Sequence, residues 1–147
     1  MLYLEDLKLG DAFATGTQAV TAEEIIAFGR QFDPQPFHTD AVAARNSFFG
    51  QLVASGWHTA AVSMRLMVES LFGPEGGMIG QGVEGVRWPR PMLPGDTLRV
   101  EMTVTEINPQ PSRSGRGKIK LHCRTLNQHG ELVQEMTARV LVPRRAA

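Results

Sequence analysis

The sequence predicts an α+β fold in which an antiparallel sheet is wrapped around one long central helix. A long apolar segment with helical spacing runs from Ser55 to Phe72. After it, the hydrophobic pattern changes to strict alternation over three stretches, which is typical of half-buried strands. A sheet of this kind needs its apolar face covered, and the long helix is the element able to cover it.

Length and composition set the first limits on function. The chain has 147 residues, a formal net charge of zero and one cysteine, Cys123. This length suits one domain with a real core, so we expect a single domain over residues 1–147. The lack of a basic excess argues against nucleic acid as the main partner. A lone cysteine leaves no internal disulfide and no cysteine-based zinc cluster, and Cys123 is expected to be a small buried residue.

The sequence shows no signal for export or for a membrane. The first residues include no basic region followed by a long apolar stretch, and no later segment reaches the ~20 apolar residues of a membrane span. We therefore expect a soluble, cytoplasmic protein with no membrane partner.

The first third of the chain predicts a strand and then helices. Residues 11–20 look like a first strand, and Thr21 with Glu24 forms a capping box that starts a helix. The prolines at 34 and 36 disfavour helical geometry in the residues before them, so this helix should end near Phe32 and a loop should follow to His38. A short helix to about Arg45 is expected after that loop.

The predicted central helix is apolar around most of its circumference, which usually means burial. Its apolar residues are Trp57, Ala60, Ala61, Val62, Met64, Leu66, Met67, Val68, Leu71 and Phe72. Gly73 and Pro74 end it. The glycine-rich stretch from 73 to 85 lacks the Gly-Lys-Ser/Thr ending of a phosphate loop, so a flexible connection is predicted there.

Three long strands are predicted in the second half from alternating apolar residues. These are Leu98, Val100, Met102 and Val104, then Ile119, Leu121 and Cys123, then Leu132, Met136, Ala138 and Val140. A turn at residues 94–96 precedes the first strand, and residues 127–130 join the last two as a hairpin.

The segment after the first helix holds the strongest chemical signal. Asp33 and His38 lie five residues apart on a stretch stiffened by two prolines. A carboxylate and an imidazole held together can share a water and move its protons, which is general acid–base chemistry. The alternative, that Asp33 only caps the helix or forms a turn, stays open from the residues alone.

The start of the central helix is the second candidate segment. Ser55 is a plausible N-cap, which places Gly56 in the first turn of the helix. Backbone N–H groups in this turn have no acceptor within the helix and lie at the positive end of its dipole. With no side chain at Gly56, an acyl oxygen could approach that N–H as in an oxyanion hole. An ordinary Ser-Gly helix start is the alternative reading.

Together these segments resemble the MaoC-like (R)-specific enoyl-CoA hydratase family. The resemblance is carried by the Asp33–His38 stretch, the Ser55-Gly56 helix start and the Pro94-Gly95-Asp96-Thr97-Leu98 run before the long strands. It implies the hotdog fold, assembled at least as a homodimer. It further implies that Asp33 and His38 are the catalytic pair. The substrate-binding residues would be Gly56, through its N–H, with Ser55, Trp57 and Phe37.

The function implied is reversible hydration of a 2-enoyl thioester or dehydration of a 3-hydroxyacyl thioester. Such a reaction needs no metal or redox cofactor, and CoA or phosphopantetheine is part of the substrate. Two alternatives remain. One is a hotdog thioesterase, whose carboxylate usually lies on or beside the central helix, where Glu69 near the far end is the only acid. The other is a non-catalytic acyl-thioester-binding subunit, which would not need a paired acid and base.

Overall fold

The computed structural model describes residues 2–71, 77–110 and 115–145. The helices are η1, a 3₁₀ turn (Leu4–Asp6), α1 (Ala22–Phe32), α2 (Pro36–Thr39), α3 (Ala41–Ala44) and α4 (Gly56–Leu71). The strands are β1 (Ala12–Ala14), β2 (Gln18–Ala19), β3 (Ile79–Arg87), β4 (Thr97–Asn108), β5 (Gly117–Leu126) and β6 (Leu132–Val142). The sheet is antiparallel with the order β1-β4-β5-β6-β3, and β2 also pairs with β4.

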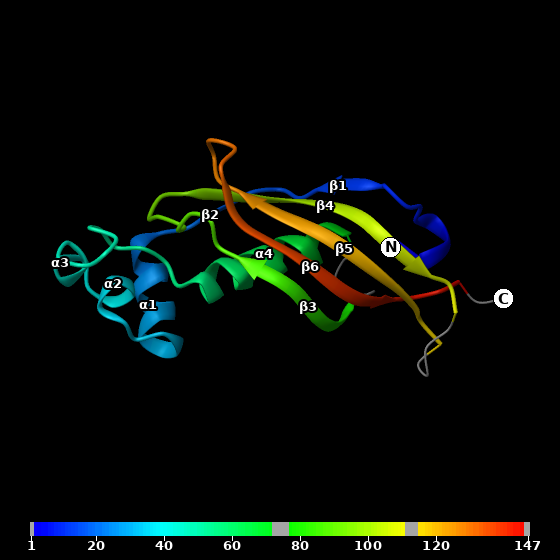
Figure 1. Cartoon of the computed structure of the whole chain (residues 1–147), viewed down its shortest axis with the longest axis horizontal. Helices are drawn as coiled ribbons and strands as arrows, with labels where there is room; N and C mark the ends of the chain where they lie inside the picture. The colour runs from blue at the N-terminus through cyan, green and yellow to red at the C-terminus, as the bar shows by residue number, and fades with distance from the viewer. Residues whose placement is uncertain (1, 72–76, 111–114, 146–147) are drawn as a thin grey trace.

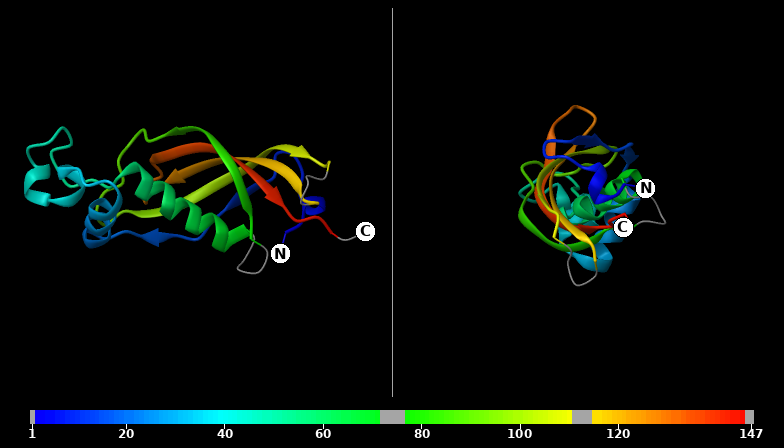
Figure 2. Two further views of the ribbon diagram at one scale, coloured as in Figure 1. Left: turned by 90° about the horizontal axis from the view of Figure 1, so that it is seen from below. Right: turned by 90° about the vertical axis from the view of Figure 1, so that its right-hand side faces the viewer.

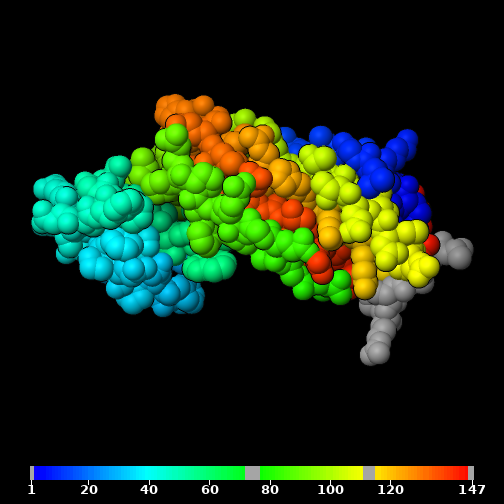
Figure 3. Space-filling model, viewed as in Figure 1, coloured from blue at the N-terminus to red at the C-terminus, as the bar shows by residue number. Residues whose placement is uncertain are grey.

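The sheet curves around α4, as the hotdog fold requires (Figures 1 and 2). The inner side chains of α4 and of the sheet form one hydrophobic core, which includes Val62, Leu66, Met67, Val100, Met102, Leu121, Ala138 and Val140. The helices α1, α2 and α3 project beyond one end of the sheet (Figures 1 and 3). The junction between this helical end and the sheet lies at the start of α4.

The three long strands are confirmed, and the alternation identifies the buried face correctly. In β4 the side chains of Leu98, Val100, Met102 and Val104 are all buried. The hairpin between β5 and β6 closes with a hydrogen bond from the N–H of Gly130 to the carbonyl of Asn127, 3.0 Å long. Cys123 is buried, and burial raises the pKa of its thiol to about 12.

The predicted first strand is interrupted. Instead of one strand over residues 11–20, β1 and β2 pair with different parts of β4. Between them the hydroxyl of Thr15 accepts from the N–H of Val100 at 2.9 Å, where a continuous ladder would use a backbone carbonyl. The Thr15 hydroxyl therefore replaces a backbone acceptor at the break between β1 and β2.

The prediction of a flexible connection over residues 73–85 is wrong for the part that the structure describes. Ile79–Arg87 forms β3, which pairs with β6 and has irregularities between Gly80 and Gly82 and between Glu84 and Arg87. Backbone hydrogen bonds from β6 hold this strand, and they require no side chains. Residues 73–76 lie outside the described residues.

The central helix is confirmed, but only one face of it is buried. Trp57 and Met64 face outward, exposed to 59% and 38%. The sequence pattern predicted burial around most of the helix because apolar composition alone does not show which face of a helix the sheet covers. Phe72, Gly73 and Pro74, expected at the end of the helix, lie outside the described residues.

Among the helices that the structure describes, none combines the length and the apolar character needed to cross a bilayer.

The capping box at the start of α1 is formed as predicted. The hydroxyl of Thr21 accepts from the N–H of Glu24 at 3.1 Å, and the Glu24 carboxylate accepts from the N–H of Thr21 at 3.0 Å. These bonds satisfy backbone donors that the first turn would otherwise leave unpaired.

Replacing Thr21 with alanine should lower the free energy of unfolding by about 1 kcal/mol, because the cap is lost. Urea denaturation of Thr21→Ala measures this cost. The matched control is Thr17→Ala at an exposed position, which should stay within about 0.5 kcal/mol of the parent. Equal stability of the two variants would show that the capping box contributes nothing.

Candidate active site

The end of α1 places the candidate acid. The N–H of Asp33 donates to the carbonyl of Gly29 at 2.8 Å, and the backbone then leaves helical geometry, with φ −150° and ψ 70° at Asp33. The helix α1 therefore ends at Phe32, as the two prolines had led us to expect.

His38 lies on a one-turn helix and not on a loop, which corrects the sequence prediction. Pro36 is the first residue of α2, a position that its fixed φ suits. The proline that was expected to keep the segment extended thus starts a new helical turn.

Glycine at position 29 sets how closely α2 approaches α1. A Cβ there would lie 2.7 Å from the carbonyl oxygen of His38 and 2.9 Å from its Cβ. Any side chain at position 29 would push the His38 backbone away. Glycine at position 29 therefore lets α2 pack closely against α1, and this packing sets the position of the His38 side chain.

The imidazole of His38 is held at both nitrogens. Its Nδ1 lies 2.7 Å from the carbonyl oxygen of Val53, and its Nε2 lies 3.3 Å from Oδ2 of Asp33. A carbonyl only accepts, so Nδ1 carries the hydrogen of this bond. In the neutral ring Nε2 is then an acceptor that faces the Asp33 carboxylate.

The surroundings of Asp33 favour its charged form. Burial raises the pKa of this carboxyl, but side-chain hydrogen bonds from Gln35 and Ser55 and the charge of His38 outweigh it, so the pKa lies below its usual value. The Gln35 amide donates to Oδ1 at 2.7 Å. A carboxylate and an acceptor nitrogen thus face each other, and a shared proton or a water donating to both relieves the repulsion.

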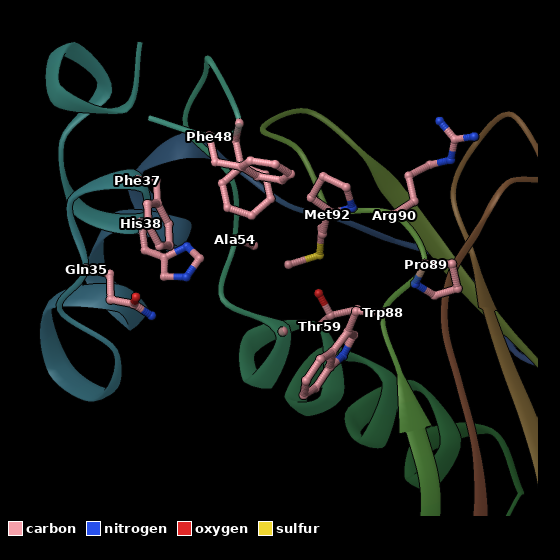
Figure 4. Close-up of a pocket in the computed structure, with 13 residues that line it drawn as sticks. Gln35, Phe37, His38, Phe48, Ala54, Thr59, Trp88, Pro89, Arg90 and Met92 are labelled. Atoms are coloured by element: carbon pink, nitrogen blue, oxygen red, sulfur yellow. The ribbon is translucent and has the colours of Figure 1, made fainter. Parts of the chain in front are cut away.

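A cavity of about 500 Å³ opens at this pair, between the helical end and the start of α4 (Figure 4). Its walls are mostly apolar and are formed by Gln35, Phe37, His38, Phe48, Phe49, Ala54, Gly56, Thr59, Trp88, Pro89, Arg90, Pro91 and Met92. Such a cavity, with few polar groups, is typical of a small-molecule site.

The structure brings the two segments identified from the sequence to the same cavity. Phe37 and His38 from the first segment and Gly56 from the second all line it. Asp33 does not line the cavity itself but pairs with His38, and Ser55 is buried at the start of α4, where its side chain helps to lower the pKa of the Asp33 carboxyl.

Trp57 does not line the cavity, although the resemblance placed it among the substrate-binding residues. Its side chain is largely exposed, and its ring meets that of Trp88 edge-on at 5.1 Å. Successive residues of a helix point in different directions, so the neighbour of a cavity residue need not face the cavity.

Trp88 is the reason that position 56 must be glycine. A Cβ at Gly56 would lie 2.5 to 2.8 Å from three carbons of the Trp88 indole. The sequence argument attributed the missing side chain to an approaching oxygen, but the indole occupies that direction. The N–H of Gly56 is in the first turn of α4 and has no acceptor within the helix.

Sequence reasoning missed several residues of this site. Trp88 and Met92 precede the predicted turn at 94–96, and Phe48 and Phe49 lie in a segment with no periodic pattern. No local signal marks any of them. Among the described residues, no three side chains of the metal-ligating types come together.

Comparisons with known proteins agree with this fold and show the family. A family model described as a MaoC-like domain matches residues 8–123. The uncharacterized protein YdeM of Bacillus subtilis is 30% identical over 142 residues, which is 96% of this chain and 99% of YdeM. The crystal structure of the MaoC-like dehydratase from Rhodospirillum rubrum is 51% identical, covers all of both chains and superposes with a TM-score of 0.89. The unliganded R-hydratase PhaJ1 from Pseudomonas aeruginosa is 26% identical, with a TM-score of 0.80 over 97% of this chain and 86% of PhaJ1.

A second histidine, His58, joins α4 to α1 beside the cavity. It is buried and stacks on Phe28 with 4.7 Å between ring centroids and 6° between planes. Its Nδ1 has no hydrogen-bond partner among the described residues. Burial lowers the pKa of His58, and the charge of Glu24 offsets only part of that effect.

The pKa of His58 predicts how stability changes with pH. Below about pH 6.5 the unfolded chain binds a proton at this histidine while the folded chain does not, so the free energy of unfolding should fall as the pH drops through that value. In His58→Phe, which keeps the stack on Phe28, this part of the pH dependence should disappear. Urea denaturation between pH 7.5 and pH 5 measures it, with His129→Gln in the exposed hairpin as the control. Parallel curves for the parent and His58→Phe would contradict the assignment.

Proposed function

Since this chain belongs to the MaoC-like dehydratase family, we propose that its hydratase or dehydratase activity acts on a 2-enoyl thioester and the corresponding (R)-3-hydroxyacyl thioester. The observation that carries the proposal is the pairing of His38 with Asp33 at the wall of an apolar cavity. The similarity to the R-hydratase PhaJ1 supports the reaction class and the stereochemistry.

In the proposed reaction, the pair binds one water and holds one proton between its two members. Asp33 takes a proton from the water as its oxygen attacks C3 of the enoyl group. The proton on Nε2 of His38 passes to C2. The pair then holds its one proton on Asp33, and transfer across the 3.3 Å contact returns it to His38. The reaction moves protons and no redox electrons, so the proposal requires no redox cofactor.

The proposed role of Gly56 is to bind the thioester oxygen. Attack at C3 gives an enolate-like intermediate whose negative charge lies largely on this oxygen. The N–H of Gly56 lies at the positive end of the α4 dipole, and Gly56 lines the same cavity as His38. One such donor typically contributes about 3 kcal/mol to transition-state stabilisation.

We propose that the thioester is carried by CoA or phosphopantetheine. The acyl group would lie among the apolar side chains of the cavity, with Phe37, Phe49 and Met92 as its contacts. Arg90 lines the cavity with a side chain that is 54% exposed, so the long carrier arm would leave the cavity beside it.

The two alternatives have less support. A thioesterase of this fold would need a carboxylate on or beside α4, but Glu69 is exposed near the far end and pairs with Arg65 at 3.0 Å. A binding subunit would not need the tautomer of His38 to be fixed against a carboxylate. The acid–base pair therefore favours catalysis.

Removing either member of the pair should nearly abolish turnover. Asp33→Asn and His38→Gln should each lower kcat/KM for crotonyl-CoA about 10²-fold or more, the usual contribution of a general acid or base. Loss of the enone absorbance measures the reaction. Matched controls are Asp40→Asn, because asparagine caps a helix as well as aspartate does, and His129→Gln; both should keep normal rates. Near-normal hydration by Asp33→Asn or His38→Gln would refute the assignment.

We further propose that the chain forms a homodimer through the outer face of α4 and the strand β3. Exposed apolar side chains gather on these two elements, and they include Trp57, Met64, Ile79 and Val83. In the described sheet β3 is an edge strand, and an uncovered apolar edge favours association.

Sedimentation at micromolar concentration should show a dimer. Val83→Arg on β3 should shift the protein toward the monomer, because it places a charge within the proposed apolar contact. The control is Val42→Arg, a similarly exposed valine on α3, which should leave the dimer intact. A monomeric parent protein that retains activity would exclude this assembly.

A further inference from the structure

Trp88 lies against Gly56, whose N–H is the proposed donor to the thioester oxygen. Its indole occupies the space that a side chain there would need, and it forms part of the cavity wall (Figure 4). The side chain of Trp88 is 38% exposed. A large aromatic side chain left partly exposed at the wall of a cavity is available to contact a ligand.

Gln134 on β6 holds the indole in this position. The Nε1–H of Trp88 donates to Oε1 of Gln134 at 2.9 Å. Since an indole nitrogen only donates, the amide oxygen has to face it. The two residues are 46 positions apart in the sequence, so the sheet brings them together.

The amide nitrogen of Gln134 shows that the hydrogen bond to Trp88 carries an energetic cost. Gln134 is 1% exposed, and its Nε2 has no hydrogen-bond partner among the described residues. A buried donor without a partner is unfavourable, and an apolar residue would avoid this cost. The glutamine therefore supplies an acceptor for the indole at a position where the core alone would favour a hydrocarbon.

Two further contacts restrict the indole. Trp57 meets it edge-on from the solvent side, with ring planes 78° apart, and Gly56 lies beneath it. With Nε1 tied to Gln134, the plane and the depth of the ring are both fixed. A fixed wall is what preorganised binding of a transition state requires.

We infer that Trp88 is the wall that aligns the thioester group with the N–H of Gly56, and that Gln134 is a positioning residue acting through Trp88. This inference rests on the proposed function. The indole limits the angle from which the thioester oxygen can approach, and it keeps water away from the N–H. Excluding water strengthens a hydrogen bond to developing charge.

A double-mutant cycle tests the coupling of the two residues. Trp88→Phe removes the donor but keeps an aromatic ring, and Gln134→Met removes the acceptor with little change in volume. Each should lower kcat for crotonyl-CoA about tenfold with KM little changed, because the alignment matters most in the transition state. Trp88→Phe/Gln134→Met should lose no more than the more damaging single variant. Losses that multiply, or a kcat for Gln134→Met equal to that of the parent, would overturn the inference.

Thr125→Val separates alignment from general loosening of the core. Thr125 lies opposite Gln134 in the β5–β6 register, is equally buried, and shares a 2.7 Å hydrogen bond with Ser63. This variant should lose thermal stability, because Ser63 loses its hydrogen-bond partner in the core, but it should keep the parent kcat. An equal loss of kcat in Thr125→Val would assign the effect to the core and overturn the role of Gln134.

Fluorescence tests the contact without turnover. In Trp57→Phe, Trp88 is the only tryptophan, and saturating butyryl-CoA, which has no double bond to hydrate, should shift its emission. Free CoA should not. If the parent protein fails to hydrate any 2-enoyl thioester, the proposed function falls, and this measurement still decides the position of Trp88. Calorimetric binding of butyryl-CoA without a change in emission, or no binding at all, would overturn the inference.

Discussion

The hydrogen bond from Nδ1 of His38 to the carbonyl of Val53 is the constraint on which the candidate site depends. It keeps a hydrogen on Nδ1 and orients the ring so that Nε2 faces Asp33. Val53 is itself held in place, because its N–H donates to the carbonyl of Phe37 at 3.0 Å. The next residue is held as well, since the N–H of Ala54 donates to the carbonyl of Met92 at 2.9 Å. Only Ala54 and Ser55 separate Val53 from Gly56. A short, hydrogen-bonded segment therefore carries both the orientation of the imidazole and the start of α4, and neither can move far without the other.

Much of the fold could be predicted from the sequence because local physics agrees with the final structure in those segments. Alternation in β4, β5 and β6 reflects one buried face, and the capping box at Thr21 satisfies donors that belong to α1 alone. The strand β3 could not be predicted, since its glycines have no preference for strand geometry and only β6 specifies its backbone. Helix α2 was missed for a related reason. Pro36 is compatible both with an extended segment and with a first helical turn, and contact with α1 at Gly29 selects the turn.

The candidate site also contains parts that the sequence indicated and parts that it could not. The spacing of Asp33 and His38 suggested their pairing, although the residues alone also allowed Asp33 to be only a cap or part of a turn. The wall formed by Trp88 could not be predicted, since the residues that fix it come from α4 and β6 and meet only in the folded sheet. The reason for the glycine at position 56 could not be derived for the same cause, because the group that excludes a side chain there lies 32 positions away in the chain. Side chains that meet across long separations leave no periodic trace in the sequence.

The order of strands has a consequence for the biosynthesis of this protein. In the described sheet β3 pairs with β6, whose last residue is Val142, so β3 leaves the ribosome long before its partner exists. Until then the apolar face of α4 also lacks part of the sheet that covers it. Closing such long loops is slow, and unpaired apolar segments are prone to associate with other chains in the meantime. Chains truncated before β6 should therefore depend on chaperones or be degraded, and Trp88 can bind Gln134 only after β6 has been synthesised.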